Sequence, residues 1–532
     1  MLATKNIPDH VPDSAVFDFD IYGDERLGDN LHESYESLHA DAPDIFYTPR
    51  NGGHWMVTRF DHIADITRDP EHFSVREMQI PRVANPPVFI PLSLDPPDNF
   101  PYRHALMPFF APKSVTAMEP KIRQFAVDII ESIIDKGECD FVEDVSSQFP
   151  VSVFMELMGM PLEKLRDFRA VADEYFEART DEDVANLFGK IVGIMTELIE
   201  LRRAHPEDDL ISRMVQFEIE GRPITLGELQ SICSILFLGG MDTVTNVSSY
   251  LYRHLAGDPK LQARLAADAS IVPKFVEEGL RSFGVVNTPR IVQKDCERFG
   301  LKFKTDDMVL CMLPLGGRDN RKNEDPNKFD IDRKRIEHIT FSSGPHLCLG
   351  HHLARMELRI LTEEWVKRIP AFRARPGVKA HSRVGTVMAL ESLMRPDELT
   401  SGADRPYWSS LLTGEVRLPR CCGCGAYHWP AVWRCSSCGG WVHDWVEVSL
   451  KGEIYSWTRT WHAFSGAEAF SVPFVSIVVA LDEADGARLI GTLEGADDTV
   501  AIGDRVTGRV DHIEMQGSKL PALRWTVQGQ SA

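Results

Sequence analysis

The sequence lacks any long apolar run and any pattern of a cleavable leader. Nowhere among its 532 residues do about 18 consecutive apolar residues occur, which excludes a membrane-spanning helix. The first segment, residues 1–20, mixes Asp, Pro and Lys without an apolar stretch, so it is neither a signal peptide nor an anchor. We therefore expect a cytoplasmic protein.

Clustered positive charge is also missing. The formal net charge is -21, and no basic stripe stands out. Because contacts to nucleic-acid phosphates need grouped Lys and Arg, the sequence argues against a nucleic-acid partner. Internal repeats and low-complexity segments are absent as well. With 43% hydrophobic and 26% charged residues over 532 positions, the composition is that of a soluble globular protein with two or more cores.

Cysteine is used unevenly along the chain. Of the ten cysteines, Cys139, Cys233, Cys296, Cys311 and Cys348 are isolated, whereas Cys421, Cys422, Cys424, Cys435 and Cys438 form a cluster. Isolated thiols suit a reducing compartment, and a cluster suggests a metal.

Apolar residues at three- and four-residue spacing predict a region rich in helices. Helices are predicted over residues 115–136, 150–158, 162–179, 183–203, 259–267 and 272–283. Thr225 and Glu228 form a capping box that starts a further helix, about 45 Å long, ending near Ala256. Prolines are so dense between Pro81 and Pro101 that an irregular loop is predicted there.

Strands are predicted in two places. Short β-like stretches lie at residues 53–58, 290–292, 301–303 and 308–313. Beyond a charged stretch with Pro and Gly at residues 395–406, alternating or apolar runs predict strands at 453–461, 474–481, 487–493, 505–513 and 523–527. Five short strands in so short a segment indicate a small barrel and, with the change in composition, a domain boundary.

One stretch, residues 341–350, holds a lone cysteine between glycines just before a helical pattern. Backbone N–H groups at a helix start can donate to sulfur, and the helix dipole lowers the pKa of a thiol there. We therefore expect Cys348 to be held as a thiolate. Such a thiolate could be a nucleophile, a redox sensor or an axial metal ligand; the remaining interpretation is a small buried hydrophobic residue.

The whole stretch resembles the haem-binding loop of the cytochrome P450 superfamily. That loop follows the pattern Phe-x-x-Gly-x-His/Arg-x-Cys-x-Gly. Its fixed positions are filled here by Phe341, Gly344, His346, Cys348 and Gly350. By this resemblance Cys348 is the proximal ligand of a haem iron, and Phe341 and Gly350 lie beside the haem.

A second stretch lies inside the long predicted helix. Gly239 and Gly240 each cost about 1 kcal/mol relative to alanine in mid-helix, so something must offset them. One interpretation is a close helix crossing. The other is that glycine lets a flat cofactor and dioxygen approach, while the Thr243 hydroxyl and the Asp242 carboxylate relay protons. The stretch resembles the oxygen-activation motif of the same superfamily, Ala/Gly-Gly-x-Asp/Glu-Thr, which implies these roles for Asp242 and Thr243.

A third match to that superfamily is Glu278 with Arg281, three residues apart, and a later arginine, Arg333. Pairs at this spacing are mostly solvated surface bridges, so the signal is weak by itself. By the resemblance the three residues form a buried structural network behind the haem.

The two haem propionates require cationic partners. The resemblance suggests Arg103, Arg290 and His346. In many relatives a histidine stands four residues before the first of these arginines, and here that position is Asn99.

Several segments resemble the camphor-hydroxylase branch of the bacterial members, namely residues 17–20, 51–55, 94–97 and 240–244. Soluble bacterial members take electrons one at a time from a small 2Fe–2S ferredoxin, so a ferredoxin and its reductase are implied partners. Pro87 stands where a polar side chain would anchor the camphor ketone, which argues against camphor itself. An apolar pocket is still expected from Phe89, Leu92, Ile235, Leu238, Gly239, Val285 and Val286, and ordinary core packing is the alternative for part of this set.

The cysteine cluster has the spacing of a metal site. Two Cys-x-x-Cys pairs, Cys421 with Cys424 and Cys435 with Cys438, are separated by ten residues and can place four thiolates around zinc. A rubredoxin-like iron site and free thiols are the alternatives, and Cys422 is a spare. With the five strands, the cluster resembles the DUF-35-type zinc-ribbon and OB-fold family, which is linked to acyl-CoA metabolism and docks on thiolases, aldolases or hydratases. Nucleic-acid binding by an OB-fold needs a basic aromatic groove, which the acidic residues here argue against.

Together these observations predict a mainly α-helical haem-thiolate fold with small β-sheets, followed by a zinc ribbon and a five-stranded OB-fold barrel. The predicted parts are a cytochrome P450 domain (1–396), a linker (397–406), a helix with the zinc ribbon (407–450) and the OB-fold domain (451–532). The expected cofactors are haem b and a structural zinc.

The predicted activity is hydroxylation of an apolar small molecule: a terpenoid, a steroid or an acyl chain that could be a CoA thioester. The last domain would recruit an acyl-CoA or a partner enzyme. The other class of function is a haem scaffold or sensor that does not oxygenate.

Overall fold

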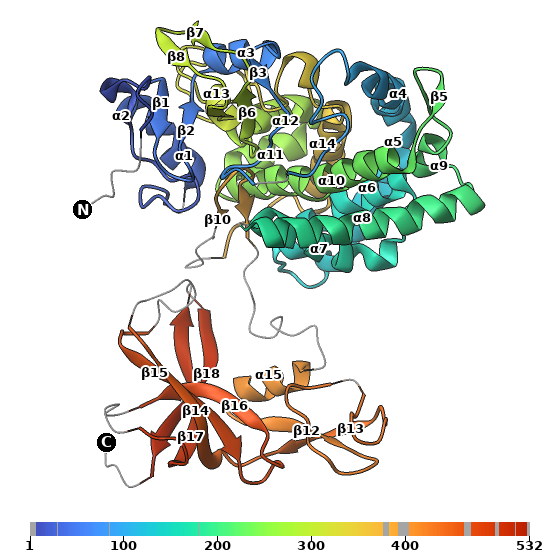
Figure 1. Cartoon of the computed structure of the whole chain (residues 1–532). Coiled ribbons are helices and arrows are strands. Elements are labelled where there is room, and N and C mark those ends of the chain that lie inside the picture. The colour runs from blue at the N-terminus through green and yellow to red at the C-terminus, as the bar shows by residue number, and fades with distance from the viewer. Residues whose placement is uncertain are drawn as a thin grey trace. The chain divides into compact units, whose positions relative to one another are not determined.

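The computed structural model describes residues 7–28, 30–83, 86–178, 180–375, 382–391, 404–432, 434–461, 470–494, 500–515 and 518–528. The chain divides into two compact units (Figure 1): unit 1, of residues 1–375 with 380–392, and unit 2, of residues 376–379 with 393–532. The predicted linker lies outside the described residues up to position 403. The boundaries between the four predicted parts stay a prediction.

Unit 1 is built mainly from helices. Its α-helices are α1 (Leu31–Glu36), α2 (Leu38–Asp41), α3 (Phe60–Arg68), α4 (Phe100–Phe110), α5 (Pro112–Ile134), α6 (Phe149–Met158), α7 (Leu165–Glu177), α8 (Asp181–Ala204), α9 (Leu210–Met214), α10 (Leu226–Ala256), α11 (Pro259–Ala267), α12 (Val272–Ser282), α13 (Leu313–Gly317) and α14 (His351–Arg368). Short 3-10 turns lie at Asp13–Ala15, Leu162–Lys164, Ala269–Ile271 and Gly344–His346, and a π turn lies at Val142–Ser146. No helix among the described residues is long and apolar enough to cross a bilayer.

The long helix α10 is confirmed, with its predicted start. The Thr225 hydroxyl accepts the Glu228 N–H at 3.3 Å, and the Thr225 N–H donates to the Glu228 carboxylate at 2.8 Å, so both halves of the capping box are formed. The helix has 31 residues and packs against α6, α7, α8 and α11 (Figure 1). It therefore forms the central element of unit 1.

The other predicted helices are confirmed with small shifts of their ends. The segment predicted as a helix over 162–179 begins with a 3-10 turn before α7, and position 179 lies outside the described residues. The predicted loop from Pro81 is irregular over 81–83 and 86–99, but helix α4 already begins at Phe100. Pro101 fits into the first turn of α4 because that turn needs no donor from its backbone nitrogen.

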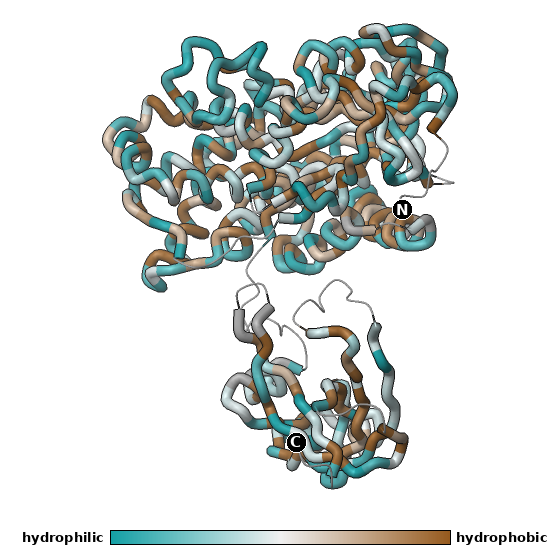
Figure 2. The backbone as a smooth tube through the Cα atoms, turned by 90° about the vertical axis from the view of Figure 1, so that its left-hand side faces the viewer, coloured by the Kyte–Doolittle hydropathy of each residue, from teal (hydrophilic) through white to brown (hydrophobic). Residues whose placement is uncertain are grey.

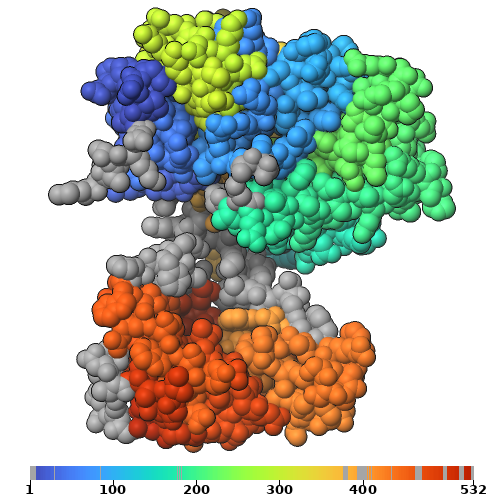
Figure 3. Space-filling model, in the orientation of Figure 1, coloured from blue at the N-terminus to red at the C-terminus, as the bar shows by residue number. Residues whose placement is uncertain are grey.

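One mixed sheet lies in unit 1, with the strand order β1 (Ile45–Thr48), β2 (His54–Val57), β9 (Met308–Cys311), β6 (Thr288–Val292) and β3 (Phe73–Ser74). β2 and β9 run parallel, with Trp55 opposite Val309, so the beginning of the chain and the region near residue 300 adjoin (Figure 3, blue and yellow-green). Two-stranded hairpins are formed by β4 (Glu218–Ile219) with β5 (Arg222–Pro223), β7 (Cys296–Arg298) with β8 (Leu301–Phe303), and β10 (Ser382–Arg383) with β11 (Ala389–Leu390).

Hydrophobic residues of unit 1 form separate buried clusters rather than one core. The largest gathers side chains of α5, α6, α7, α8 and α10, and a second gathers the far half of α10 with α11, α12 and the sheet. Figure 2 shows hydrophobic segments (brown) mostly inside unit 1 and hydrophilic ones (teal) on its outer turns.

A buried ionic network ties α12 to the segment after α13. Glu278 and Arg281 are both 0% exposed and form two hydrogen bonds of 2.7 Å, and Arg333 joins Glu278 at 3.0 Å. Arg281 also donates to the carbonyls of Gly317 and Pro326, each at 2.9 Å. Glu278 compensates one of the two guanidinium charges, and backbone carbonyls accept the other donors of the arginines, so the buried groups are paired or hydrogen-bonded.

Unit 2 consists of a short helix, a two-stranded ribbon and a closed barrel. The helix is α15 (Arg405–Leu412), and the ribbon pairs β12 (Arg417–Cys421) with β13 (His443–Glu447). The barrel order is β14 (Lys451–Thr460), β15 (Phe474–Leu481), β16 (Arg488–Leu493), β18 (Ser518–Val527) and β17 (Arg505–Met515). The prediction of a five-stranded barrel is confirmed, with inward residues alternating along β15.

Candidate functional site

Cys348 lies in the turn that leads into α14. Its backbone N–H donates to the Phe341 carbonyl at 3.0 Å and closes the loop, while part of the residue stays exposed. Burial of the sulfur raises the pKa of the Cys348 thiol, and the Gly350 N–H and the charge of Arg103 offset only part of this. The Gly350 N–H and Arg103 favour the thiolate, as would a metal cation bonded to the sulfur, and the thiolate form of Cys348 stays a prediction.

The middle of α10 has two faces with different surroundings. Gly239 is exposed, and nothing in the described part of the chain lies within 4 Å of a Cβ placed there. At Gly240 a Cβ would lie 2.3 Å from the ring of Phe154. Thr243, one turn beyond Gly239, donates its hydroxyl to the Gly239 carbonyl at 3.0 Å. One face of α10 is thus open at a glycine and a threonine, and the other is closed by a helix crossing.

Asp242 lies in a buried polar environment, although it precedes Thr243 directly. Its carboxyl group is 0% exposed and lies 3.5 Å from the Arg169 guanidinium of α7 and 3.4 Å from the Arg383 guanidinium of β10. Burial raises the pKa of Asp242. The positive charges of Arg383 and Arg169 lower that pKa, but by less than burial raises it. The side chain can therefore take up a proton more readily than an exposed aspartate.

Three groups that can carry positive charge converge near the Cys348 loop. Arg103 of α4 donates to the Leu347 carbonyl at 2.6 Å, and Arg290 of β6 is 2% exposed. Burial, followed by the charges of Arg290 and Arg103, lowers the pKa of His346 to about 3. Among the described residues neither arginine forms an ion pair, and neither ring nitrogen of His346 has a hydrogen-bond partner.

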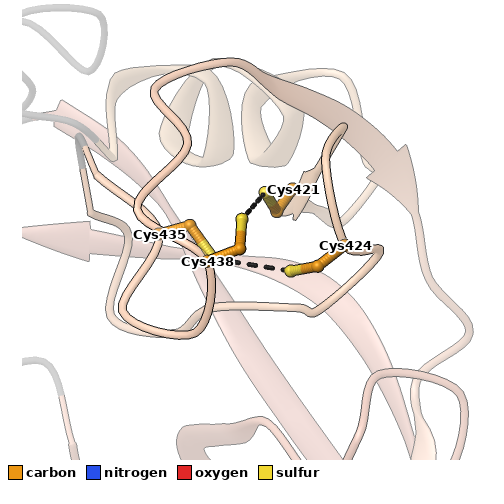
Figure 4. A group of neighbouring side chains, drawn as sticks. All are labelled: Cys421, Cys424, Cys435 and Cys438. Carbon is orange, nitrogen blue, oxygen red and sulfur yellow. Dashed lines mark hydrogen bonds between the residues drawn. The ribbon is translucent and has the colours of Figure 1, made fainter.

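Among the described residues, one group of side chains is suited to binding a metal ion, and it lies in unit 2. The sulfur atoms of Cys421, Cys424, Cys435 and Cys438 all lie within 4.8 Å of one another (Figure 4). The shortest distances are 3.5 Å between the sulfurs of Cys421 and Cys438 and 3.6 Å between those of Cys424 and Cys435. Four thiols at such distances could hold one ion tetrahedrally.

The two Cys-x-x-Cys turns are closed in the same way. Arg420 donates to the Gly425 carbonyl at 3.0 Å, and Arg434 donates to the Gly439 carbonyl at 3.2 Å. Both glycines have φ of 77°, a conformation that side chains with a Cβ rarely adopt. The Cys438 N–H, directed at the sulfur, lowers the pKa of Cys435. Each turn is therefore shaped by its own contacts.

Comparison with known proteins decides the family. The family model described as Cytochrome P450 matches residues 110–369, and the one described as ChsH2, C-terminal OB-fold domain matches residues 445–511. Probable cytochrome P450 127A1 of Sinorhizobium fredii is 32% identical over 401 residues, which cover 74% of this chain and 97% of that protein. The chain belongs to the cytochrome P450 family.

Solved structures and other relatives agree with this P450 assignment. The crystal structure of CYP101J2 is 36% identical, with a TM-score of 0.67 over 73% of this chain and 98% of that chain. Linalool 8-monooxygenase of Pseudomonas putida is 28% identical over 64% of this chain and 89% of its own length. Steroid C26-monooxygenase of Mycolicibacterium smegmatis is 28% identical over 64% of this chain and 86% of its own length. The P450 unit is thus an oxygen-dependent oxidoreductase of the monooxygenase type, and the barrel of unit 2 is an OB-fold.

The residues described above fit the haem that the P450 family implies. Haem carries two carboxylates, and the half-buried Arg103 with the buried Arg290 and His346 offers donors that form no ion pair with a described carboxylate. The open face at Gly239 leaves room for a flat group beside the helix backbone. Cys348 would then supply the sulfur ligand. The positive charge of the iron at the sulfur would favour the thiolate over the protonated thiol.

The predicted pocket residues of this P450 fall into two clusters. Phe89 and Leu238 are buried in the largest cluster, and Leu92 and Ile235 pack against it. Val285 belongs to the second cluster, and Val286 packs against that one. Whether these residues share one substrate cavity stays a prediction.

Some residues of the site gave no signal in the sequence. Arg169 and Arg383 reach Asp242 from elements 73 and 141 positions away. His428 lies between the two pairs of cysteines, and its Nε2 is 3.1 Å from the sulfur of Cys435. None of the three belongs to a spacing pattern, so only the folded chain reveals them.

Replacing each of the two central glycines of α10 by alanine should give opposite results. Gly240→Ala overpacks the contact with Phe154 and should cost about 1–3 kcal/mol of unfolding free energy. Gly239→Ala meets open space and should gain up to about 1 kcal/mol from helix propensity, and it should keep haem because the motif accepts alanine at this position. Denaturant unfolding of haem-free and haem-loaded protein measures both effects. Equal changes for the two variants in the haem-free protein would contradict the two-faced description.

Proposed function

We propose that this P450 hydroxylates an apolar small molecule of the terpenoid, steroid or acyl-chain class. The observation that carries the proposal is the open Gly239 and Thr243 face of α10, bordered by the apolar side chains of Ile235 and Leu238. Two relatives bear the names linalool 8-monooxygenase and steroid C26-monooxygenase, which supports apolar substrates of this kind. A 2Fe–2S ferredoxin with its reductase is the proposed electron source.

The proposed roles follow from the surroundings of each residue. Haem, when bound, supplies the activation of dioxygen and the electron storage. Cys348 is the proposed proximal ligand, with Phe341 and Gly350 beside it. Arg103, Arg290 and His346 hold the haem carboxylates, and the network of Glu278, Arg281 and Arg333 keeps the scaffold behind them rigid.

Proton delivery is assigned to Asp242 and Thr243. The raised pKa of Asp242 lets its carboxyl group hold a proton, and Arg169 and Arg383 stabilise the carboxylate after the proton leaves. The Thr243 hydroxyl on the open face then donates the hydrogen bond through which the proton reaches the reacting oxygen. Asp242 thus works on the buried side of α10 and Thr243 on the open side.

For unit 2 we propose a structural zinc and a recruiting role. The four thiols are the donor set that zinc prefers in closed sites. The OB-fold similar to that of ChsH2 supports recruitment of an acyl-CoA thioester or of a partner enzyme.

A ligand titration tests the proposed substrate class. The haem-loaded full chain and a chain lacking residues 405–532 are titrated with a monoterpene alcohol, a steroid and an acyl-CoA, scored by the low-to-high-spin change. At least one apolar compound should shift the spin state of both chains, and the acyl-CoA should bind the full chain more tightly. If reduced protein with carbon monoxide lacks the shifted Soret band of a cysteine-ligated haem, or if no apolar compound binds, the proposal is wrong. Unchanged acyl-CoA affinity after truncation, with no partner captured, would reject the recruiting role.

Removing the Thr243 hydroxyl should uncouple oxygen use from product formation. In Thr243→Ala, dioxygen consumption continues while product formed per dioxygen falls about tenfold or more, because the donor on the open face is lost. Thr243→Ser keeps the hydroxyl and should restore most of the coupling. The ratio of product to dioxygen consumed is the measurement, and fully coupled turnover by the alanine variant would reject the assignment.

Zinc removal should loosen the ribbon and spare the barrel. The full chain should contain about one zinc ion, Cys424→Ser should lose it, and Cys422→Ser should keep it, because Cys422 lies outside the four-sulfur group. Chelation should speed amide exchange over residues 421–440 much more than in the barrel strands, since the four sulfurs lie in the ribbon and its turns. Metal analysis and exchange mass spectrometry check this; equal zinc content in both variants would contradict it.

A further inference from the structure

A single side chain of α10 holds the irregular segment 86–94. The Ser231 hydroxyl accepts the Ile90 N–H at 2.7 Å and donates to the Val88 carbonyl at 2.6 Å. Ser231 is 7% exposed, so water does not easily replace either bond. Both backbone groups next to Phe89 therefore depend on one hydroxyl.

The ring of Phe89 makes a second set of contacts, with α7 and α8. The ring packs edge-on against Phe188 of α8, with centroids 5.4 Å apart, and against Tyr175 of α7, with centroids 6.4 Å apart. Ser93 closes the turn around Phe89, because its N–H donates to the Phe89 carbonyl at 2.7 Å and its hydroxyl accepts the Phe89 N–H at 3.1 Å. The segment thus bridges α10 to the α7 and α8 pair.

Ser231 also lies on the ridge of α10 that leads to the open face. Ser231, Ile235, Gly239 and Thr243 are spaced four residues apart, so they form one ridge of neighbouring positions that winds about 40° around the helix at each step. At 1.5 Å per residue, Ser231 is about 18 Å from Thr243 along the helix axis. A segment fastened at Ser231 and carrying Phe89 and Leu92 therefore covers the start of that ridge.

We propose that Ser231 is a positioning residue that latches segment 86–94 onto α10 and so controls how fast small apolar ligands reach the open face of the helix. The inference rests on the proposed function in one respect, that the open face is where ligands bind. Its physical basis is that one hydroxyl satisfies two backbone groups. Without it the Ile90 N–H and the Val88 carbonyl must find water, and this favours an opened segment.

The helix offers a matched control. Ser234 is one turn further along α10, is 0% exposed, and its hydroxyl has no hydrogen-bond partner among the described residues. Ser234→Ala therefore makes the same chemical change without touching the segment. Ser231→Thr keeps the hydroxyl and serves as the conservative variant.

The test uses the haem-loaded full chain without substrate. In Ser231→Ala, amide exchange of Ile90 should be about tenfold faster than in the unmodified protein. The association and dissociation rates of 4-phenylimidazole, followed by the Soret shift, should both rise several-fold while its equilibrium constant changes less, because a latch acts on both directions of passage. Ser234→Ala and Ser231→Thr should resemble the unmodified protein in both measurements.

Two results would overturn the latch. One is unchanged exchange of Ile90 in Ser231→Ala, and the other is faster exchange with unaltered 4-phenylimidazole rates. Should Ser231→Ala fail to retain haem, Ser231→Cys, which keeps the side-chain volume but weakens both hydrogen bonds, carries the same comparison. Because 4-phenylimidazole binds iron directly, the latch can hold even if the terpenoid, steroid and acyl-CoA titrations fail, so the two proposals are tested separately.

Discussion

The P450 unit depends on a buried arginine, Arg290 of β6, with which no described carboxylate forms an ion pair. The half-buried Arg103 of α4 and the uncharged His346 of the Cys348 loop lie near it. Burial lowers the pKa of Arg290, and burial with the two arginines lowers that of His346 to about 3. Isolated charges are costly in such surroundings, so the arrangement is unfavourable until a group with carboxylates is bound. Haem binding and the stability of unit 1 should therefore be coupled.

The Glu278 network shows the opposite solution to the same problem. Its carboxylate compensates one of the two guanidinium charges, and carbonyls of the chain accept the remaining donors of both arginines. A fold can bury such a network without a ligand, whereas the Arg290 cluster needs one. The difference separates residues that hold the scaffold from residues that hold the cofactor, and it is visible only in the folded chain.

Much of the site could be predicted because its signals are local. The Cys348 loop, the two glycines of α10, the capping box at Thr225 and the cysteine spacing each lie within a few residues or one repeat. The residues that complete these motifs come from far away in the sequence: Arg169 and Arg383 at Asp242, and Ser231 at segment 86–94. Their side chains carry no periodic or spaced pattern, so the sequence could not assign them. The start of α4 was missed for another reason: proline is accepted in a first helical turn, and α4 also contains Pro108 in its interior.

Cys348 and the cysteines of the cluster differ in what their sequence position predicts about the pKa of the thiol. At Cys348 the start of a helix suggested a low pKa, yet burial outweighs the single N–H donor and the nearby arginine, and the pKa is raised. At Cys435 the Cys438 N–H, followed by other neighbours that include His428, lowers the pKa of the thiol. The Gly440 N–H lowers the pKa of Cys438 less than the neighbouring thiols raise it, so one thiol of the cluster is favoured as a thiolate at the expense of the next.

A consequence follows for what a metal does in each unit. The turns of unit 2 are already shaped by Arg420, Arg434 and their glycines, so an ion there mainly joins two preformed turns. The Cys348 loop is closed in a comparable way, by the Cys348 N–H on the Phe341 carbonyl and by Arg103 on the Leu347 carbonyl. In both units contacts of the chain therefore shape the cysteine turn, and a metal bonded to the sulfur would favour the thiolate.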